Sequence, residues 1–543
     1  MWAEPAPGWL PVPCNRVYAD RQQFLTMKVA LTVNDFLRRA EHIYPHRAAI
    51  VDEPMQPADS WGTISYADMA ARARAQAAAL DAMGIEAGER VAIVSHNSAR
   101  LLTALFGVSG SGRVLVPINF RLVAEEVRYI VEHSGARILM VDPELDEALA
   151  DVRCEHRFVI GSDSDAPAEH AEPRPWVYDE DATATINYTS GTTARPKGVQ
   201  LTHRNIWLNA TTFGWQLGVN DRDVYLHTLP QFHCNGWGVL YAVTGMGATH
   251  VIIRKIDGPE ILRRVEQHGV TLMCGAPAVA NAILDAASTW DGPIPGSGRV
   301  RMVIAGAPPP TRTIERIETE LGWEFIQIYG LTETTPLLTM NRRRSEYDAL
   351  DPADRAAKLS RAGAPAIGVD IRISPDGEVL ARGNHVMAGY WNQPDATNDA
   401  IRPADDDPDG PSWFRTGDGG HLDSDLYVTI SDRKKDVIIT GGENVSSIEV
   451  EDAIFSHPDV SEVAVIGVPD EKWGEKVMAL VVTSSGSLLT EAELIAYTKT
   501  KLAGYKCPKS VEFRESLART ATGKLQKFKL REPYWVGETK QVH

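Results

Sequence analysis

The stretch YTSGTTARPKGVQLTHRN, residues 188–205, says most about how this chain folds and what it binds. Its first half groups hydroxyl side chains around a glycine and then supplies a Pro-Lys-Gly step. Phosphate oxygens are satisfied by short hydroxyl donors, by backbone N–H groups left open beside glycine and by a nearby cation. The stretch therefore predicts a mobile loop that holds a polyphosphate, which implies ATP chemistry. The residues expected to contact the phosphates are Thr189, Ser190, Gly191, Thr192, Thr193 and Lys197.

A P-loop and a surface loop without a ligand are the alternatives for this stretch. A P-loop needs a Gly-Lys-Ser/Thr ending that opens a helix, whereas Lys197 is followed by Gly198 and Val199. A surface loop would account for the Ser-Gly-Thr-Thr stretch alone. The added Pro-Lys-Gly step and the motifs downstream favour phosphate binding.

Length and composition indicate a soluble, enzyme-sized protein with more than one domain. The chain has 543 residues, of which 43% are hydrophobic and 23% are charged, and these values are typical of folded globular proteins. A chain of this length exceeds one ordinary hydrophobic core. We therefore expect a large, subdivided domain and at least one small domain.

The charge and the cysteines narrow the classes of partner. A formal net charge of −17 argues against a nucleic-acid partner, because the electrostatic term that dominates such binding would be repulsive. Any anionic substrate must then be bound by local basic groups. The five cysteines are scattered and form no CxxC pair, so neither a disulfide framework nor a zinc site is suggested. A reducing, cytoplasmic location fits this pattern best.

The sequence shows no targeting signal and no transmembrane segment. Residues 1–26 contain Pro, Trp and charged side chains and lack the apolar core of a signal peptide. We interpret them as an extension, disordered or dispensable, before a more ordinary start at Met27. The longest uncharged apolar stretch, residues 239–253, is interrupted by glycines and falls short of the roughly 20 residues that span a bilayer.

Apolar β-branched runs alternate with Ala-, Arg- and Glu-rich stretches from about residue 31 to residue 325. The helical stretch at 66–84 ends on Gly84, which suits the end of a helix. This alternation predicts an α/β fold with mostly parallel sheets and flanking helices. The charged or Pro/Asp-rich residues 341–360 and 402–412 are expected to be exposed loops. The predicted strands include 90–95, 113–119, 137–142, 250–254 and 300–306.

The sequence pattern changes near residue 432, and we place a domain boundary between residues 434 and 435. Ser446 followed by Glu449 has the form of a capping box that begins a helix. The following pattern predicts a small α+β domain, residues 435–543, beside a large domain, residues 27–434. The expected elements are a helix to about Phe455, strands at 460–468 and 476–482, and a helix from about Glu491 to Leu502.

Three further segments follow the phosphate loop in order: IQIYGLTETTP at 326–336, the segment from WFRTGDGG to GGENVSSIEVE at 413–451, and RTATGKLQK at 519–527. In this order, over essentially all of residues 30–530, the chain resembles the adenylate-forming superfamily of acyl-CoA synthetases, aryl-CoA ligases, luciferases and nonribosomal adenylation domains. LPQFHCNGWG at 229–238 and GYWNQPDATNDAI at 389–401 look most like fatty-acyl ligases, the medium-to-long-chain carboxylate–CoA ligases.

The resemblance implies a reaction in two halves. A fatty or other hydrophobic acid and ATP give an acyl-adenylate and pyrophosphate, and the thiol of coenzyme A then displaces AMP. Because two anions must approach each other at the α-phosphorus, neutralising charge is the central requirement. By resemblance, Thr332 touches the α-phosphate and Glu333 holds Mg²⁺, which would bridge phosphate oxygens and stabilise the departing pyrophosphate.

The same resemblance assigns the nucleoside contacts. The ring of Tyr329 would face the adenine on one side, and the backbone of residues 306–308 would face it on the other. Asp418 would accept hydrogen bonds from both ribose hydroxyls, with Arg433 assisting. Taken singly, a buried tyrosine or a loop aspartate is more often structural, but the ordered set favours function. The full expected set is Gly306, Ala307, Pro308, Gln327, Tyr329, Gly330, Asp418 and Arg433.

Two lysines of the C-terminal region carry roles by resemblance. Lys524, in a Thr-Gly-Lys turn, resembles the mobile lysine that stabilises charge as the carboxylate attacks phosphorus. Lys435 matches the hinge about which the small domain swings between adenylation and thioester formation. A lone exposed lysine would otherwise be a solvated charge.

The resemblance also points to the acid and CoA sites. His233 and Trp237 would border the acyl pocket, although a hydrogen-bonded core position explains His233 equally well. For Trp473 the alternatives are stacking on the adenine of CoA and packing on its own domain. The expected pantetheine path is lined by Gly441, Gly442 and Glu443.

Several alternatives stay open at this stage. The acyl group could pass to the phosphopantetheine of an acyl carrier protein, the adenylate could be oxidised as in luciferases, or the acid could be aromatic. A catalytically silent nucleotide-binding module is disfavoured because Glu333, Asp418 and Lys524 are all present. The expected partners are therefore small molecules, with monomer and homodimer both open.

Overall fold

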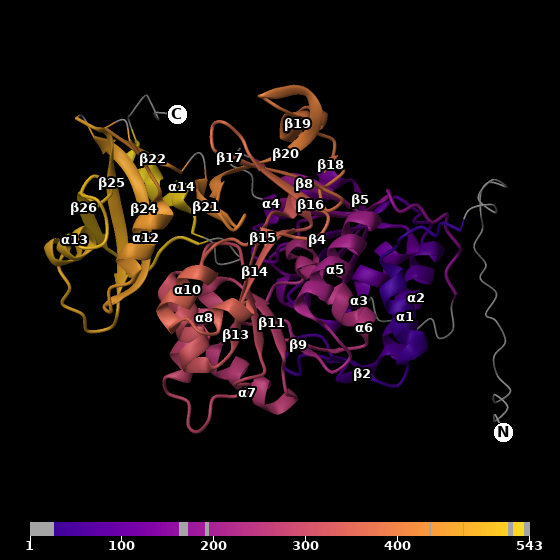
Figure 1. Ribbon diagram of the computed structural model, residues 1–543. Helices are drawn as coiled ribbons and strands as arrows, with labels where there is room; N and C mark the ends of the chain where they lie inside the picture. Colours follow the sequence, from indigo (N-terminus) through magenta and orange to yellow (C-terminus); the bar gives the residue numbers. More distant parts are fainter. Residues whose placement is uncertain are drawn as a thin grey trace.

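The computed structural model describes residues 27–161, 172–189, 195–433, 436–441, 443–470, 472–519 and 525–536. Two large sheets with helices packed between and around them form the N-terminal part, and a smaller C-terminal part stands beside it (Figure 1). The predicted extension, residues 1–26, lies outside the described residues. Among the residues described, no helix is both long enough and apolar enough to cross a membrane.

The first large sheet has nine strands and is parallel through its middle, as the sequence pattern predicts. Strands buried on both faces are expected to be almost continuously apolar, and all four residues of β11 are buried. Antiparallel strands close both edges. In spatial order the strands are β15 (Ala364–Pro365), β14 (Leu337–Arg342), β13 (Glu324–Gly330), β12 (Arg301–Ile304), β11 (Leu272–Gly275), β9 (Val224–Leu226), β10 (Thr249–Val251), β1 (Ala48–Val51) and β2 (Thr63–Ser65).

The second large sheet has seven strands, and it contains the strands on both sides of the expected phosphate loop. Its β3, β4, β5, β6 and β7 pair in parallel, whereas β8 runs antiparallel to β7 and to β18. In spatial order the strands are β18 (Gly389–Tyr390), β8 (Lys197–Thr202), β7 (Thr183–Thr189), β4 (Val114–Ile118), β3 (Arg90–Val94), β5 (Ala136–Val141) and β6 (His156–Val159).

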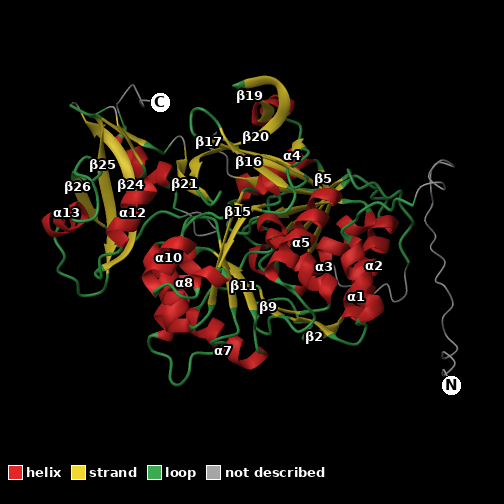
Figure 2. Ribbon diagram, viewed as in Figure 1, coloured by secondary structure: helices red, strands yellow, loops and turns green. Residues whose placement is uncertain are grey.

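Helices cover both faces of both sheets, so the predicted α/β class is confirmed (Figure 2). Alternate residues of one strand belong to different cores: Ile326 of β13 joins the core between the sheets, and Phe325 joins the core on the outer face. The period of two follows from the pleat. The helices are α1 (Asn34–Ile43), α2 (Tyr66–Ala82), α3 (Ala99–Gly107), α4 (Ala124–Ser134), α5 (His203–Leu217), α6 (Val239–Met246), α7 (Gly258–His268), α8 (Pro277–Ala287), α9 (Thr311–Arg316), α10 (Pro352–Leu359) and α11 (Pro394–Ala400).

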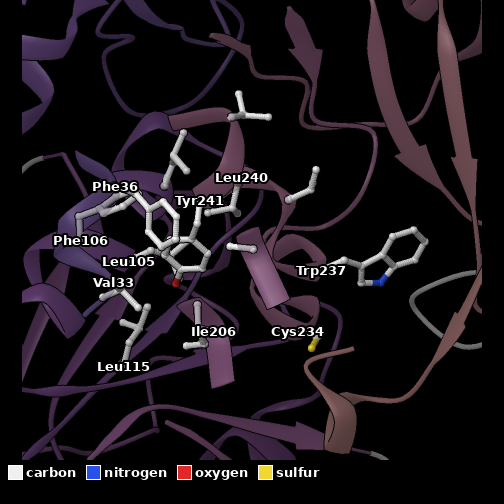
Figure 3. Packing of buried hydrophobic residues seen from close by; sticks show 14 of the residues in the cluster. Val33, Phe36, Leu105, Phe106, Leu115, Ile206, Cys234, Trp237, Leu240 and Tyr241 are labelled. Atoms are coloured by element: carbon white, nitrogen blue, oxygen red, sulfur yellow. The ribbon is translucent and has the colours of Figure 1, made fainter. Parts of the chain in front are cut away.

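The largest core lies between the two sheets and is centred on α1, α3, α5 and α6. Tyr241 of α6 lies 5.4 Å from the ring of Phe106 and 5.9 Å from that of Phe36, measured between ring centroids. Trp237, four residues before Tyr241, lies apart from this aromatic group (Figure 3). The core therefore ends where a short turn, residues 233–238, leaves it for the site described below.

A third sheet, entirely antiparallel, was not predicted. Two segments that were expected to be loops, residues 402–412 and 341–360, also form regular structure. Residues 402–412 are not a loop: they form a hairpin whose exposed tip tolerates Asp and Pro, while Asp405 pairs with Arg402 and Arg415 across it. Residues 341–360 contain α10, whose Asp351 caps the helix and whose Leu359 is buried. The strands are β16 (Val369–Ile373), β17 (Glu378–Gly383), β20 (Asp407–Leu422), β19 (Ile401–Ala404) and β21 (Val428–Arg433).

The C-terminal part is the small α+β unit that the sequence predicts. Ser446 caps α12 by accepting a hydrogen bond from the backbone N–H of Glu449, but the Glu449 carboxylate binds Lys506, so the capping box is only half formed. The expected domain boundary at 434/435 stays a prediction, since both residues lie outside the described ones. The elements are β22 (Ile438–Thr440), β23 (Glu443–Val445), α12 (Ser447–Phe455), β24 (Val460–Asp470), β25 (Gly474–Thr483), α13 (Glu491–Lys499), β26 (Ser510–Phe513) and α14 (Lys527–Arg531).

Candidate active site

A narrow pocket lies where β12 and β13 end, at the edge from which ligands are bound in open α/β sheets. Its volume is about 30 Å³, room for roughly one water molecule. In this pocket His233 and Trp237, which are expected at the acid site, lie beside Gly306, Gly330 and Thr332, which are expected nucleotide contacts. Its lining consists of His233, Cys234, Trp237, Ala305, Gly306, Ile328, Gly330, Leu331, Thr332 and Pro336.

The turn after β13 fixes the position of Thr332. Gly330 has no space for a side chain, because a Cβ atom there would lie 1.5 Å from the carbonyl oxygen of Pro336. The hydroxyl of Thr334 accepts a 2.9 Å hydrogen bond from the backbone N–H of Leu331 and donates one of 2.7 Å to the Pro336 carbonyl. Thr332 is therefore presented to the pocket by a closely packed, hydrogen-bonded turn.

The expected ribose site is assembled from three strands. The Tyr329 hydroxyl donates a 2.8 Å hydrogen bond to Oδ2 of Asp418, and Arg433 Nε lies 2.8 Å from Oδ1. Asp418 is 4% exposed and lies opposite Arg433 in the pairing of β20 with β21. Burial, and then the Asp418 carboxylate, raise the pKa of Tyr329 well above its usual value. Tyr329 thus stays a neutral donor, and Asp418 keeps an acceptor-only carboxylate at this position.

The expected adenine contacts lie at the ends of neighbouring strands. Gly306, Ala307 and Pro308 follow β12 and are exposed, and Gly306 has a φ of +93°. Gln327 lies in the middle of β13 and is 4% exposed. Within the described part of the chain its Oε1 has no hydrogen-bond partner. The exposed backbone of residues 306–308 and the amide oxygen of Gln327, which is free to accept a hydrogen bond, suit a polar planar ligand.

Glu333, the expected magnesium ligand, has a neighbour that was not predicted. The hydroxyl of Tyr390 donates a 3.0 Å hydrogen bond to Oε1 of Glu333. The Lys197 ammonium nitrogen lies 4.7 Å from the centroid of the same ring. Burial, and then Glu333, raise the pKa of Tyr390. Tyr390 belongs to the GYWNQPDATNDAI segment, so a signal was present in the sequence, but its partner lies 57 residues away.

The donor set fits a magnesium ion held jointly with a nucleotide. Mg²⁺ prefers oxygen ligands and is usually bound by one or two carboxylates together with substrate phosphates. Glu333 supplies one such carboxylate. In the described residues no group of three His, Cys, Asp or Glu side chains forms a closed metal site. The arrangement therefore suits a metal that arrives with ATP.

The ends of the phosphate loop are the facing residues of a hairpin. Thr189 at the end of β7 pairs with Lys197 at the start of β8. Because Lys197 begins a strand, the exclusion of a P-loop is confirmed. A surface cleft of about 420 Å³ adjoins Lys197 and the residues before Asp418. It is lined by Lys197, Glu378, Ala396, Asp399, Ala400, Arg402, Arg415, Thr416 and Gly417.

The expected CoA residues are partly brought together. Gly441 donates its backbone N–H to the Trp473 carbonyl at 2.8 Å, and a Cβ atom at Gly441 would lie 2.7 Å from the indole. Trp473 thus packs on its own domain while 46% of it is exposed. Glu443 is exposed at the start of β23. Seven expected site residues lie outside the described ones: Ser190, Gly191, Thr192, Thr193, Lys435, Gly442 and Lys524.

The fold and the site together define an enzyme of the adenylate-forming class. The family model described as AMP-binding enzyme matches residues 37–391, and the model described as AMP-binding enzyme C-terminal domain matches residues 449–524. The first match covers more than half of the chain. The chain therefore belongs to the AMP-binding enzyme family, and the resemblance found in the sequence is confirmed.

Similar proteins agree on the reaction class and differ in the acid. A 4-hydroxybutyrate–CoA ligase of Metallosphaera sedula is 36% identical, with 91% of this chain and 93% of that protein covered. A 2-methylpropanoate–CoA ligase of Humulus lupulus is 34% identical, with coverages of 92% and 95%. The crystal structure of ATP-bound MatB from Rhodopseudomonas palustris matches with a TM-score of 0.79 at 30% identity, covering 93% and 99%. The predicted enzyme class, an AMP-forming acid–thiol ligase, is confirmed.

Proposed function

We propose that this ligase activates a short hydrophobic carboxylic acid with ATP and transfers the acyl group to coenzyme A. One observation carries the proposal: a single narrow pocket joins Trp237 and His233, the expected acid wall, to Thr332, the expected α-phosphate contact. An acid seated against Trp237 would place its carboxylate at the turn that holds Thr332. Approach of the two reacting groups in one enclosed space is the main requirement of such a reaction.

The first half-reaction joins the acid to AMP. A carboxylate oxygen attacks the α-phosphorus, the bond from that phosphorus to the bridging oxygen breaks, and pyrophosphate leaves with the electron pair. Lys197 would neutralise phosphate charge, and Asp418 and Tyr329 would hold the ribose and adenine. Mg²⁺, when bound with ATP, would supply charge neutralisation at the phosphate oxygens, and Glu333 would hold it. In the second half-reaction the CoA sulfur attacks the acyl carbon and AMP leaves.

The proposed acid is shorter than the medium or long chain that is expected from the sequence. Trp237, which is 4% exposed, forms part of the pocket wall. A long acyl chain would have to displace this indole. The two ligases named above act, by their names, on four-carbon acids, which is consistent with a short substrate here.

The test is AMP release from ATP and Mg²⁺ with acids from C2 to C18 and several aryl acids, each with and without CoA. We expect CoA-dependent release that peaks at about C3 to C5. A maximum at C12 or longer would refute the short-acid proposal. Acid-dependent pyrophosphate exchange without CoA-dependent turnover would point to a carrier protein as acceptor. Trp237→Gly, which suits the φ of 58° at this position, should move the maximum to longer acids.

The roles of the two lysines outside the described residues can be separated by half-reaction. Lys524→Ala should abolish most adenylate formation while sparing CoA transfer from supplied acyl-adenylate. Lys435→Pro should stall the enzyme after adenylation. Equal loss of both half-reactions in Lys524→Ala, or a normal overall rate in Lys435→Pro, would contradict these assignments.

A further inference from the structure

Five successive residues, Cys234 to Gly238, have left-handed backbone conformations, and Cys234 and Trp237 among them line the pocket. Their φ angles are 46°, 52°, 58°, 58° and 75°. Glycine adopts this region freely, but a residue with a Cβ atom does so at a cost. All five residues are buried. A left-handed turn that contains Cys and Trp must therefore be held in place by its surroundings.

A closed set of three side chains holds the first half of the turn. Asn235 Nδ2 donates a 2.9 Å hydrogen bond to Oγ1 of Thr185, and Thr185 Oγ1 donates one of 2.8 Å to Oδ1 of Asn187. Asn187 Nδ2 in turn donates to Asn235 Oδ1 at 3.2 Å and to the Phe232 carbonyl at 3.3 Å. The three side chains are at most 2% exposed, so each bond forms away from competing water.

A second amide holds the other half. Asn209 of α5 donates from Nδ2 to the Trp237 carbonyl at 3.0 Å and accepts at Oδ1 from the backbone N–H of Leu337 at 3.2 Å. Gly238 packs so closely that a Cβ atom would lie 2.3 Å from Asn209 Nδ2. Both ends of the turn are thus fixed by buried amides.

The anchors lie close in the sequence to the expected phosphate and magnesium contacts. Asn187 lies on β7, two residues before Thr189, where the phosphate loop begins. Leu337 begins β14, four residues after Glu333. The turn is therefore bonded directly to the strand entering the phosphate loop and, through Asn209 of α5, to the strand following Glu333.

We propose that Asn235 is a positioning residue that sets acid selectivity, because its bonds to Thr185 and Asn187 hold Trp237 and His233 at the pocket. The inference rests on the proposed function. Loss of the Asn235 amide frees the turn from β7, so the indole no longer limits the depth of the pocket. The amide bonds to β7 at Thr185 and Asn187, before the phosphate loop begins, so ATP binding should change less than acid binding.

The experiment measures acid-dependent pyrophosphate exchange in Asn235→Gly, since glycine suits the φ of 52° at this position and removes the side chain that carries the amide. We expect the KM for the preferred acid to rise about tenfold and the KM for ATP to stay within about twofold. Discrimination against an acid one methylene longer, normally about 10- to 200-fold, should fall at least about fivefold. Thr185→Val, which keeps the side-chain shape and leaves Asn235 Nδ2 without its acceptor, should give a smaller change in the same direction.

The matched control is Asn341→Ala. Asn341 is 0% exposed and donates to the carbonyls of Lys358 and Arg361 at 2.9 Å, so its loss also removes a buried amide. This variant should lose a similar amount of thermal stability and keep the acid preference. Unchanged acid selectivity in both Asn235→Gly and Thr185→Val, or equal changes in the KM values for acid and ATP, would overturn the inference. Absence of acid-dependent exchange in the unsubstituted enzyme would instead refute the proposed function.

Discussion

The hydroxyl of Tyr390 is bonded at 3.0 Å to the carboxylate of Glu333. Tyr390 therefore contacts both Glu333, the carboxylate expected to hold magnesium, and Lys197, whose ammonium nitrogen lies 4.7 Å from the centroid of its ring. The side chain of Tyr390 thus orients Glu333 and contacts Lys197. Removing the charge of Glu333 and removing its hydrogen bond from Tyr390 should therefore lower adenylation to different extents.

Glu333→Gln should lower the rate of adenylation by about 100-fold or more, because it removes the charge that would hold Mg²⁺ while keeping an oxygen for Tyr390. Tyr390→Phe should lower it by only about tenfold, the scale of losing an orienting partner. Both changes should raise the Mg²⁺ concentration at half-maximal rate. The check is pyrophosphate exchange across a Mg²⁺ titration, and an unchanged titration in Glu333→Gln would show that Glu333 does not hold the metal.

Asp418→Asn should raise the KM for ATP by about 10- to 100-fold, because an amide offers one acceptor oxygen where the carboxylate offers two. The sharpest measurement compares ATP with 2′-deoxy-ATP. The unsubstituted enzyme should prefer ATP clearly and the variant much less, whereas an unchanged preference would place the ribose elsewhere.

Sequence reasoning found the parallel strands because apolar β-branched runs are local signals. It failed at residues 402–412, where the sequence PADDDPDG indicates a loop but cross-strand ion pairs to Asp405 support a hairpin. It also failed at α10, although Asp351 followed by Pro352 is a usual start of a helix. In both places the composition indicates a loop, whereas helix capping and strand pairing determine the structure.

The sequence indicates a candidate site residue where the residue type alone suggests a role, and it gives no indication where a contact depends on a distant partner. Tyr329, Asp418 and Arg433 were expected together, and the structure joins them. Asn235 meets Thr185 across 50 residues of sequence. No sequence pattern indicates the left-handed turn, because Cys and Trp do not favour positive φ.

Acid should destabilise the protein through histidines that are buried in the neutral form. Burial lowers the pKa of His203 to about 4, and its Nδ1 accepts a 3.3 Å hydrogen bond from the backbone N–H of Val33. Burial also lowers the pKa of His250 to about 3. An unfolded histidine binds a proton near pH 6.5, so between pH 6.5 and 4 the unfolded state takes up protons that the folded state does not.

Stability should therefore be unaffected by His203 above about pH 6.5 and should fall as the pH drops toward 4, by about 3 kcal/mol for this residue. His203→Gln keeps an acceptor for the Val33 N–H and removes the titration. Urea unfolding from pH 7.5 to 4.5 should show a shallower loss in His203→Gln than in the unsubstituted protein. Parallel pH profiles for the two proteins would exclude His203 as a source of acid sensitivity.

The buried ion pair between Lys527 and Glu451 should dominate the local stability of the small domain. Lys527 Nζ lies 2.8 Å from Oε1 of Glu451, and the two side chains are 13% and 16% exposed. Lys527 also bonds to the hydroxyl of Ser447, which donates a 2.5 Å hydrogen bond to Asp432 of β21. Burial lowers the pKa of Lys527, but the carboxylates of Glu451 and Asp432 outweigh it and raise that pKa above its usual value.

Glu451→Gln and Lys527→Met should each destabilise the small domain by about 3 kcal/mol, because each leaves one buried charge without its partner. The double variant should be more stable than either single variant, since neither member of the Glu451–Lys527 pair is then left charged without the other. Thermal unfolding of the full chain, followed by circular dichroism, would rank the four proteins. A double variant less stable than both single variants would show that the pair itself, and not the penalty for breaking it, stabilises the contact between β21 and α14.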